Sequence, residues 1–325
     1  MLHRVRVLVL FVVVAAVPCA VRAQATPSPS GASIVYQTTT NGKNGIWTMG
    51  LDGSNPMELA IDVDGASVHP DWSPTGDRIV FEVQQGEDGS LWTMNADGAD
   101  PALLFECEAP CFRTEYPAWS PDGASIAFMS VEDLDGVEGP PDATAIQVLD
   151  LASGAVTDVV RTTFPTLMTG PRWSPDGKTI AVGVEHLDDD AYDLGSTIAL
   201  VDAAGGDLRE LTDPSGFAFY PDWNASQNAI VFDQQTLQYL PAPPADADTW
   251  NLFTVASDGS GLRQITDVEP GMKLFQPTWT PDGERVIATM DGPDGRVAVF
   301  VDAGSGEVRV IHDRLATHAR VQPAG

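Results

Sequence analysis

The sequence of 325 residues is poor in positive charge, in cysteine and in long apolar runs, and each shortage narrows what the chain can be. Lysine and arginine number 17 against 46 aspartates and glutamates, which gives a formal net charge of −29. A surface this acidic repels phosphate backbones, so we expect no nucleic-acid partner. The same charge favours solubility and attracts cations or basic partners.

The one marked apolar run lies at the start of the sequence. Val7–Val17 is 11 residues long, too short to span a bilayer comfortably, and it follows Arg4 and Arg6. Ala23 would suit a signal peptidase, so we predict a signal peptide over residues 1–23 and a short Ser/Pro linker over residues 24–31. Its removal would change the net charge to −32, because residues 1–23 carry three arginines and no acids.

This prediction makes the mature protein an exported one, periplasmic or extracellular, with no membrane span after cleavage. Two alternatives are an uncleaved anchor and a lipoprotein acylated at Cys19. The mature chain would keep two cysteines, Cys107 and Cys111, in a loop-like segment. An oxidising compartment favours a local disulfide between them, whereas a metal site would need further soft ligands.

The strongest positive signal is an internal repeat. A pattern related to Pro-x-Trp-Ser-Pro-Asp-Gly occurs five times, and its tryptophans lie 47, 54, 50 and 56 residues apart. Pro-Asp-Gly favours a tight turn, and each copy precedes short apolar strands and a second turn rich in glycine. Four antiparallel strands with two tight hairpins are typical of one β-propeller blade, so we expect the tryptophans to pack between blades. They are Trp72, Trp119, Trp173, Trp223 and Trp279.

The two ends of the sequence complete the count of blades. Residues 319–325 look like a sixth copy that stops at the turn, and Ile34–Tyr36 looks like the strand that should follow it. We therefore predict that the first and last segments share one sheet, which closes the ring and removes free sheet edges. The predicted fold is all-β: a six-bladed β-propeller over residues 32–325, with four antiparallel strands in each blade.

The Trp-Ser-Pro-Asp-Gly copies and the six-fold count resemble the TolB-like propeller family, whose repeat is related to that of WD-type propellers. The resemblance covers roughly residues 32–325 and implies the fold but no activity. Proteins of the TolB family proper carry an α/β domain before the propeller, where this sequence has the short linker. The repeat also resembles the propeller domains of prolyl-oligopeptidase-like peptidases, but the Gly-x-Ser-x-Gly pentad of their hydrolase domain does not occur here.

The strand order predicts two different faces. We expect the tight hairpins at one face and the long insertions 131–144, 185–197 and 234–249 at the other, where recognition usually takes place. The first two insertions are acidic and could hold Ca²⁺, but neither has the spacing of a helix-loop calcium site. We favour solvated loops and expect no cofactor. The third contains Tyr239 and several prolines and could contact a partner.

The mouth of the central channel is a second candidate site. Three residues before each tryptophan, and in the sixth copy, stand His69, Tyr116, Gly170, Tyr220, Gln276 and His318. The positions directly before the tryptophan add Asp71, Arg172, Asp222 and, in the sixth copy, Arg320. Mixed aromatic, amide and charged groups are typical of ligand sites. We therefore predict ligand binding at His69, Tyr116, Arg172, Tyr220, Gln276, His318 and Arg320.

No catalytic residue can be assigned, because the sequence has no phosphate-cradling glycine loop and too many acids for a glycosidase pair to be chosen. Our first hypothesis is a monomeric, non-enzymatic propeller that binds a protein, peptide or cell-envelope component, one with a basic surface. The alternative is a hydrolase or lyase that acts on polysaccharide or peptide at the channel mouth and uses His69 and His318. A third is a structural propeller stabilised by Ca²⁺.

Overall fold

The computed structural model describes residues 33–40, 42–59, 61–136, 139–188, 193–226, 228–236, 248–293, 295–312 and 317–323. Within these ranges the chain forms 24 β-strands and one 3₁₀ helix, Pro214–Gly216. The predicted signal peptide, the linker and Tyr239 lie outside the described residues. In the part of the chain that is described, no helix has the length and hydropathy needed to cross a membrane.

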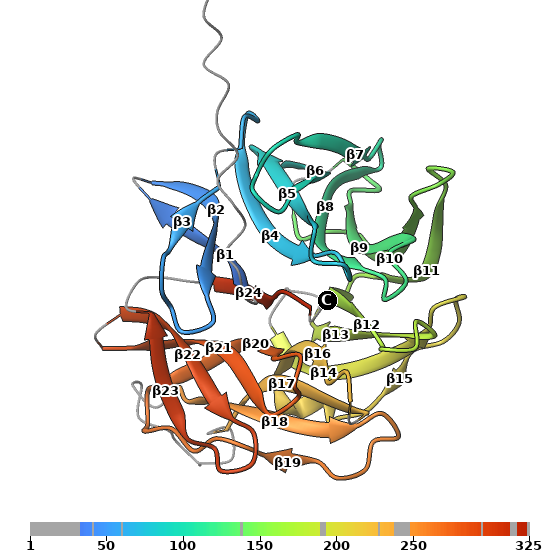
Figure 1. Cartoon of the computed structure of the whole chain (residues 1–325). Coiled ribbons are helices and arrows are strands. Elements are labelled where there is room, and N and C mark those ends of the chain that lie inside the picture. The colour runs from blue at the N-terminus through green and yellow to red at the C-terminus, as the bar shows by residue number, and fades with distance from the viewer. Residues whose placement is uncertain are drawn as a thin grey trace, which may run out of the picture.

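The strands form five sheets, in which nearly all neighbouring strands are antiparallel. The sheets follow one another around a common centre in the order of the chain (Figure 1). The first contains β24 (Thr317–Val321), β1 (Ser33–Thr40), β2 (Lys43–Gly50) and β3 (Met57–Glu58). The second contains β4 (Ala66–Trp72), β5 (Arg78–Gln85), β6 (Asp88–Asn95) and β7 (Ala102–Glu106). The third contains β8 (Cys111–Trp119), β9 (Ser125–Glu132), β10 (Ala143–Asp150) and β11 (Val156–Thr163). The fourth contains β12 (Thr166–Trp173), β13 (Thr179–Leu187), β14 (Asp193–Asp202) and β15 (Arg209–Glu210).

The fifth sheet has eight strands. They are β16 (Ala218–Trp223), β17 (Ala229–Gln235), β18 (Trp250–Ala256), β19 (Arg263–Gln264), β20 (Lys273–Trp279), β21 (Arg285–Gly292), β22 (Gly295–Asp302) and β23 (Val308–His312). Six separate sheets, one for each predicted blade, are therefore not found. The reason is local, because a single parallel pair between Trp250 and Lys273 joins β18 to β20.

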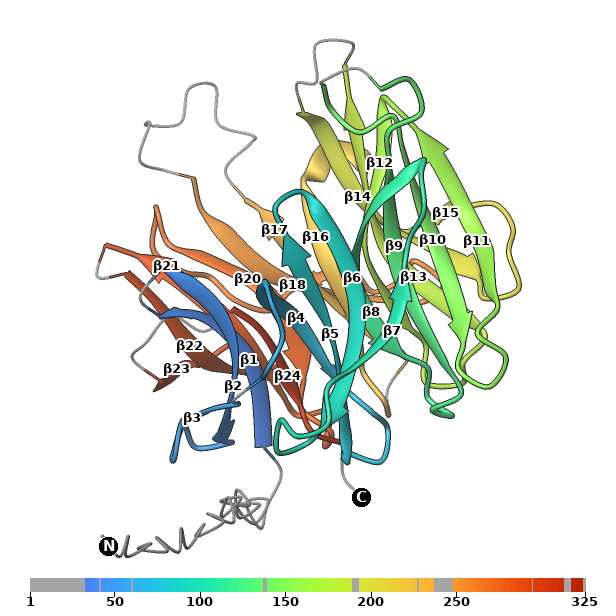
Figure 2. The same cartoon turned by 90° about the horizontal axis from the view of Figure 1, so that it is seen from above.

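The strands β4, β8, β12, β16, β20 and β24, here called the inner strands, contact one another in a closed cycle. The all-β propeller fold is thus confirmed. The first and last segments share one sheet, as predicted: Ile34 pairs with Val321 and Val35 with Arg320. Both views show β24 beside β1 (Figures 1 and 2).

The repeated turn is closed by its own side chains. Ser120 Oγ accepts the N–H of Ser125 at 2.9 Å and donates to Asp122 Oδ1 at 2.6 Å. Asp122 also accepts the N–H of Ala124 at 3.0 Å, and Gly123 takes the positive φ of 71° that the turn requires. The same bonds recur in the turns that begin at Ser174 and Thr280. This network is a physical reason for the recurrence of Ser/Thr-Pro-Asp-Gly.

The repeat tryptophans lie between neighbouring sheets, as predicted. Trp223 of β16 is buried and packs with Ile198 of the preceding sheet and Ile230 of its own. Its Nε1–H donates to the carbonyl of Arg172 on the preceding inner strand at 3.1 Å. Trp173 makes the equivalent bond to Ala118 at 3.2 Å. Each of these two side chains therefore joins adjacent sheets by packing and by a hydrogen bond.

The predicted disulfide is present. Cys107 and Cys111 are bonded, with their Cα atoms 5.6 Å apart, in the connection from β7 to β8. This connection lies at the same end of the sheet as the β5–β6 hairpin, because Glu106 pairs with Ser90. The β5–β6 hairpin and the connections between sheets define what we call the long-loop face, and the Trp-Ser-Pro-Asp-Gly turns define the turn face.

Candidate functional site

Every inner strand has the same backbone irregularity three residues before the tryptophan position. The pairing register shifts at this point in all six strands, which marks a β-bulge. The residue there has a φ between 44° and 56°, a region that side chains rarely adopt. These residues, here called the ring positions, are His69, Tyr116, Gly170, Tyr220, Gln276 and His318. Five of the six carry a side chain despite the strain, and strained residues of this kind cluster at functional sites.

The ring positions bring their side chains into contact with one another. His69 stacks on Tyr116 with 4.2 Å between ring centroids, and His318 lies edge-on to His69 at 4.4 Å. Tyr220 lies edge-on to Tyr116 at 6.2 Å, and Gln276 Nε2 lies 2.8 Å from His318 Nε2. The structure thus gathers the five predicted side chains in one cluster, although it is packed rather than an open rim. Their role as ligand-binding residues stays a prediction.

Polar residues on the neighbouring strands hold the ring backbone in place. Gln37 accepts the N–H of His69 at 2.9 Å, and Asp233 accepts the N–H of Gln276 at 2.9 Å. Glu82 lies 2.6 Å from His69 Nδ1. These three residues were not among those predicted from the sequence. A signal was present, because each follows three apolar residues of the same pattern: Ile34-Val35-Tyr36, Ile79-Val80-Phe81 and Ile230-Val231-Phe232.

The pair His69–Glu82 is uncharged at neutral pH. Burial raises the pKa of Glu82 to about 8. Burial and the nearby guanidinium groups of Arg172 and Arg113 lower the pKa of His69 to about 3. The short contact is therefore best described as a protonated carboxyl donating to a neutral imidazole, rather than as an ion pair. Gln84 Nε2 donates to the second carboxyl oxygen at 2.8 Å, which completes the support of Glu82.

Carboxyl groups with raised pKa values lie close to the two tyrosines. Burial and the neighbouring Glu82 raise the pKa of Glu115 to about 7, although Arg113 Nε lies 2.7 Å from it. Burial also raises the pKa of Asp233 well above its usual value. The tyrosine pKa values are raised too, first by burial and then by neighbouring groups that include Glu115 and Glu82 for Tyr116 and Asp233 for Tyr220. The ring is thus a site where burial hinders the ionisation of several carboxyl groups and both tyrosines.

The two predicted arginines are placed beside buried aspartates. Arg320 Nε lies 3.8 Å from Asp71, and Arg172 Nε lies 3.9 Å from Asp222. These aspartates accept the backbone N–H groups of Trp119 and Trp279, at 2.9 and 2.7 Å. Burial raises the pKa of each aspartate to about 6. The arginines and aspartates form a balanced layer next to the ring, and this layer joins adjacent inner strands.

The first acidic loop gathers three carboxylates that could hold a cation. Oxygen atoms of Asp133, Asp135 and Asp142 lie within 4.8 Å of one another. Glu132, from the same predicted loop, is instead buried and pairs with Arg161. In the second acidic loop, Asp189 and Asp190 lie outside the described residues, as does Glu138 in the first.

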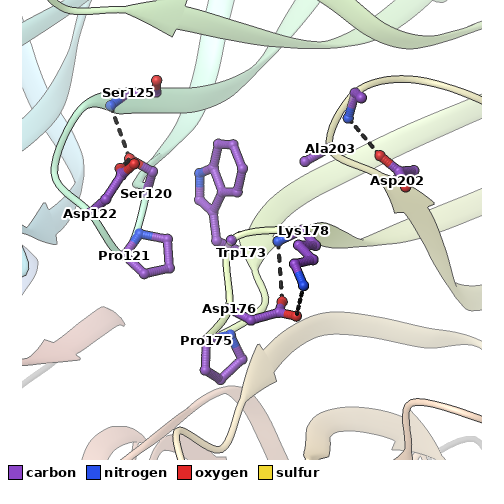
Figure 3. Close-up of a pocket in the computed structure, with 12 residues that line it drawn as sticks. Ser120, Pro121, Asp122, Ser125, Trp173, Pro175, Asp176, Lys178, Asp202 and Ala203 are labelled. Carbon is purple, nitrogen blue, oxygen red and sulfur yellow. Dashed lines mark hydrogen bonds and ion pairs between the residues drawn. The ribbon is translucent and has the colours of Figure 1, made fainter.

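A cleft on the turn face lies between the β8–β9 and β12–β13 turns, with Trp173 between them (Figure 3). Its acidic groups already have partners within their own turns. Asp176 accepts the N–H of Lys178 at 3.1 Å, and Asp202 accepts the N–H of Ala204 at 2.8 Å. Because these carboxylates are engaged in holding the turns, the cleft is a weaker candidate site than the ring.

No family model matches the chain. Among solved structures, TolB from Acinetobacter baumannii superposes with a TM-score of 0.65 and 15% identity, over 90% of this chain and 67% of that one. A putative TolB from Agrobacterium tumefaciens gives 0.61 and 17%, over 90% of this chain and 98% of that one. An oligogalacturonate lyase in complex with manganese gives 0.59 and 14%, over 86% and 73%.

One curated protein is related in sequence. The uncharacterized peptidase YuxL of Bacillus subtilis (strain 168) is 28% identical over 128 residues, which make up 39% of this chain. The match spans only 18% of the length of that protein, so it carries no activity over to this chain. The solved structures establish the architecture alone at their level of identity. On that basis this chain has the TolB-type β-propeller fold that its repeats predicted.

Proposed function

We propose that this chain is an exported, non-enzymatic propeller that binds a protein, peptide or cell-envelope component through its long-loop face and channel mouth. We count the eight-stranded sheet as two blades, which gives six, because among the described residues one parallel pair, Trp250 with Lys273, joins its two four-strand repeats. The Cys107–Cys111 bond supports export, since disulfides persist in oxidising compartments.

The observation that carries the proposal is the repeated backbone and varied chemistry of the ring. Six bulges with one conformation present two histidines, two tyrosines, a glutamine and a glycine to the same centre. Packing alone would be served by one repeated apolar residue, as the repeat tryptophans illustrate. A rigid frame with different polar groups at equivalent positions is the arrangement expected of a recognition site.

The charge of the molecule indicates the kind of partner. The formal net charge is −29, and the acidic cluster Asp133, Asp135 and Asp142 extends from the long-loop face. A partner with a basic surface would be attracted at long range, and its association would slow as salt is added. We propose that the propeller binds this partner as a monomer.

Affinity capture from cell-envelope extract tests the proposal. The bait is the mature protein, and the variant replaces residues 134–141 with a short Gly-Ser hairpin. We expect the variant to lose the captured partner while its melting temperature stays that of the wild type. Lys178→Ala, at an exposed side chain on the turn face, is the matched control and should capture normally. Equal capture by the loop variant would contradict a role for this loop.

One observation favours an enzyme as the second candidate. His69 and His318 are adjacent, and burial lowers the pKa of each, so both imidazoles are uncharged and would act on a substrate through hydrogen bonds rather than as strong bases. Two of the similar proteins support this second candidate. One is described as an oligogalacturonate lyase in complex with manganese, and the other as a peptidase. The test is turnover of oligogalacturonate and of peptide substrates. His69→Ala and His318→Ala should each abolish any activity found.

A further inference from the structure

Two neighbouring hollows on the long-loop face form one groove over the junction between the second and third sheets. The larger, of about 620 Å³, lies between the β5–β6 hairpin and the β9–β10 loop, where Pro140 and Pro141 line it. The smaller, of about 470 Å³, lies between the same hairpin and the loop closed by the Cys107–Cys111 disulfide. Asp88 and Phe112 line both hollows, so the two are continuous. We call them together the hairpin groove.

The walls of the hairpin groove are held in place by the fold. The strand β8, which begins at Cys111, packs against β5 and β6 of the preceding sheet. A Cβ atom built on Gly89 of the hairpin would lie 2.7 Å from Arg113 Cγ, so the arginine stem packs directly on the hairpin backbone. The disulfide fixes the loop that lines the smaller hollow. A ligand would therefore enter a preformed groove and lose little binding energy to ordering it.

Negative charge dominates the hairpin groove. Arg113 is the one basic residue among the described residues that line it, and its Nε lies 2.7 Å from Glu115. Asp133 accepts the N–H of Gly136 at 2.6 Å, and the other four carboxyl groups of the groove make no hydrogen bond or ion pair with a described residue. Exposed carboxyl groups are ionised at neutral pH, and a cleft lined by one sign of charge concentrates the opposite sign. The exposed acidic residues that line the groove are Glu87, Asp88, Glu106, Glu108 and Asp133.

An apolar centre separates the acidic groups of the two hollows. Phe112 is partly buried, packs against the core of the third and fourth sheets, and lines both hollows. Glu87 and Asp133 line the larger hollow alone, and Glu106 and Glu108 line the smaller one alone. Carboxylates therefore lie on either side of an aromatic ring. In an extended segment, side chains two residues apart point the same way at a spacing of roughly 6.5–7 Å, so three successive ones can follow this order.

We propose that the hairpin groove binds an extended segment of the partner in which two lysine or arginine residues flank an apolar residue, in the order cation-x-apolar-x-cation. The apolar side chain would rest on Phe112, and each cation would lie among the carboxylates of one hollow. This inference rests on the proposed function in taking the ligand to be part of a protein or peptide. It adds a defined groove and a defined pattern of residues to that function.

Two double variants test the groove, one for each hollow. Glu87→Gln with Asp88→Asn removes two charges at the exposed hairpin and keeps the shape of both side chains. Glu106→Gln with Glu108→Gln does the same at the smaller hollow. All four residues are exposed, so we expect the melting temperature of each variant to equal that of the wild type.

Asp207→Asn with Glu307→Gln is the matched control. It removes one aspartate and one glutamate, as the hairpin variant does, and gives the same net charge. Both residues are exposed and lie in the β14–β15 and β22–β23 turns. These turns are at the turn-face end of their sheets, because Asp202 pairs with Thr179 and Asp302 with Arg285.

The probe is the heptapeptide Gly-Lys-Ala-Leu-Ala-Lys-Gly, titrated with a calcium chelator present into isotopically labelled protein and followed by NMR. One comparison peptide replaces both lysines with glutamine, and another replaces the leucine with serine. We expect saturable shifts of the Asp88 and Phe112 amides, and an affinity that falls as salt is added. The affinity should be lower by about threefold or more in each groove variant, and by about fivefold or more for the serine peptide.

The control variant should bind the heptapeptide as the wild type does. Equal binding of the glutamine peptide would show that cations are not selected. Equal binding of the serine peptide would show that charge alone is recognised, as it would be by a groove for small polycations. Either result, undiminished binding by both groove variants, or the absence of a saturable shift would overturn the proposed pattern.

Envelope capture separates this inference from the proposed function. If the wild type and both groove variants capture the same partner equally well, the proposed function survives and the groove is refuted as its site. If the heptapeptide binds in the groove but no envelope component is captured, the groove survives and the proposed function fails.

Discussion

The turn face and the ring use the same repeat in opposite ways. At the turns the residue type is kept: Ser120 and Ser174 make identical bonds to the aspartate two residues on. At the ring the backbone is kept and the residue type changes, from His69 to Tyr116 to Gly170. The turns therefore carry information about the fold. At the ring, the residue type differs from one position to the next, and such differences are what a recognition site needs.

If this contrast is right, substitutions in the fold-bearing set should change stability and leave ring chemistry alone. Substitutions at the ring positions, or at the polar residues that hold them, should change binding and leave stability unchanged, or should change stability only at a defined pH. The largest effect is expected at the repeat tryptophans, and the smallest at the acidic loop of the long-loop face.

Trp223→Ala should produce the largest loss. It removes a buried side chain that packs between two sheets and a hydrogen bond to the carbonyl of Arg172. We expect the free energy of unfolding to fall by about 3–5 kcal/mol, the range for large aromatic truncations in cores. Urea unfolding followed by tryptophan fluorescence and circular dichroism measures this. Trp223→Phe keeps most of the packing and should recover more than half of the loss; no difference between Ala and Phe would show that the packing is not what matters.

Glu82→Gln should change the pH dependence of stability. From about pH 4.5 to 6.5 the raised pKa of Glu82 and the lowered pKa of His69 cancel, because each state of the pair binds one proton. Above pH 6.5 the unfolded pair loses its proton first, so wild-type stability should fall by about 2 kcal/mol toward pH 8. Glutamine keeps a donor for His69 but cannot ionise.

The measurement is thermal and urea unfolding of both proteins between pH 5 and 9. The variant should become more stable relative to the wild type as the pH rises through 6.5 to 8, because it lacks the alkaline loss. Gln84→Ala, which removes a hydrogen bond to Glu82 but no titrating group, is the control and should keep the wild-type slope. Parallel profiles for wild type and Glu82→Gln would mean that Glu82 is ionised in the native state.

Ser120→Ala should cost about 1 kcal/mol, the net value of a typical lost hydrogen-bonding group. The hydroxyl closes one turn by accepting from Ser125 and donating to Asp122. Chemical denaturation measures the loss, and capture of the envelope partner should equal that of the wild type. Weaker capture by this folded variant would contradict the separation between turn and ring.

The elements whose interactions repeat could be predicted from the sequence. Trp-Ser-Pro-Asp-Gly specifies its turn locally, so the hairpins, the packing of Trp223 and the pairing of Ile34 with Val321 follow from the pattern alone. The Cys107–Cys111 bond follows from short spacing. Such features need no knowledge of distant contacts.

What could not be predicted depends on neighbours far apart in the chain. Six separate sheets were not found because Trp250 pairs with Lys273 and joins two of the repeats in one sheet. The periodicity of the sequence does not predict this parallel pair. The positions of the ring residues were predicted, but their mutual packing depends on bulges that turn the backbone to positive φ. The pairing of Arg320 with Asp71 likewise joins residues from opposite ends of the chain.

The smallest effect is expected from calcium. Asp133, Asp135 and Asp142 lie within 4.8 Å of one another, but two of the three are exposed, and Asp142 already accepts the N–H groups of Leu134 and Asp135. A site that contributed to folding would raise the melting temperature by mass action when Ca²⁺ is added. We expect less than about one degree of change between roughly 5 mM Ca²⁺ and excess chelator, the scale below which no significant binding energy is involved. Asp135→Asn should behave in the same way. A calcium-dependent increase in the melting temperature that Asp135→Asn removes would instead make this loop a structural metal site. The loop would then contribute to the stability of the fold, as the turns do, and not to recognition.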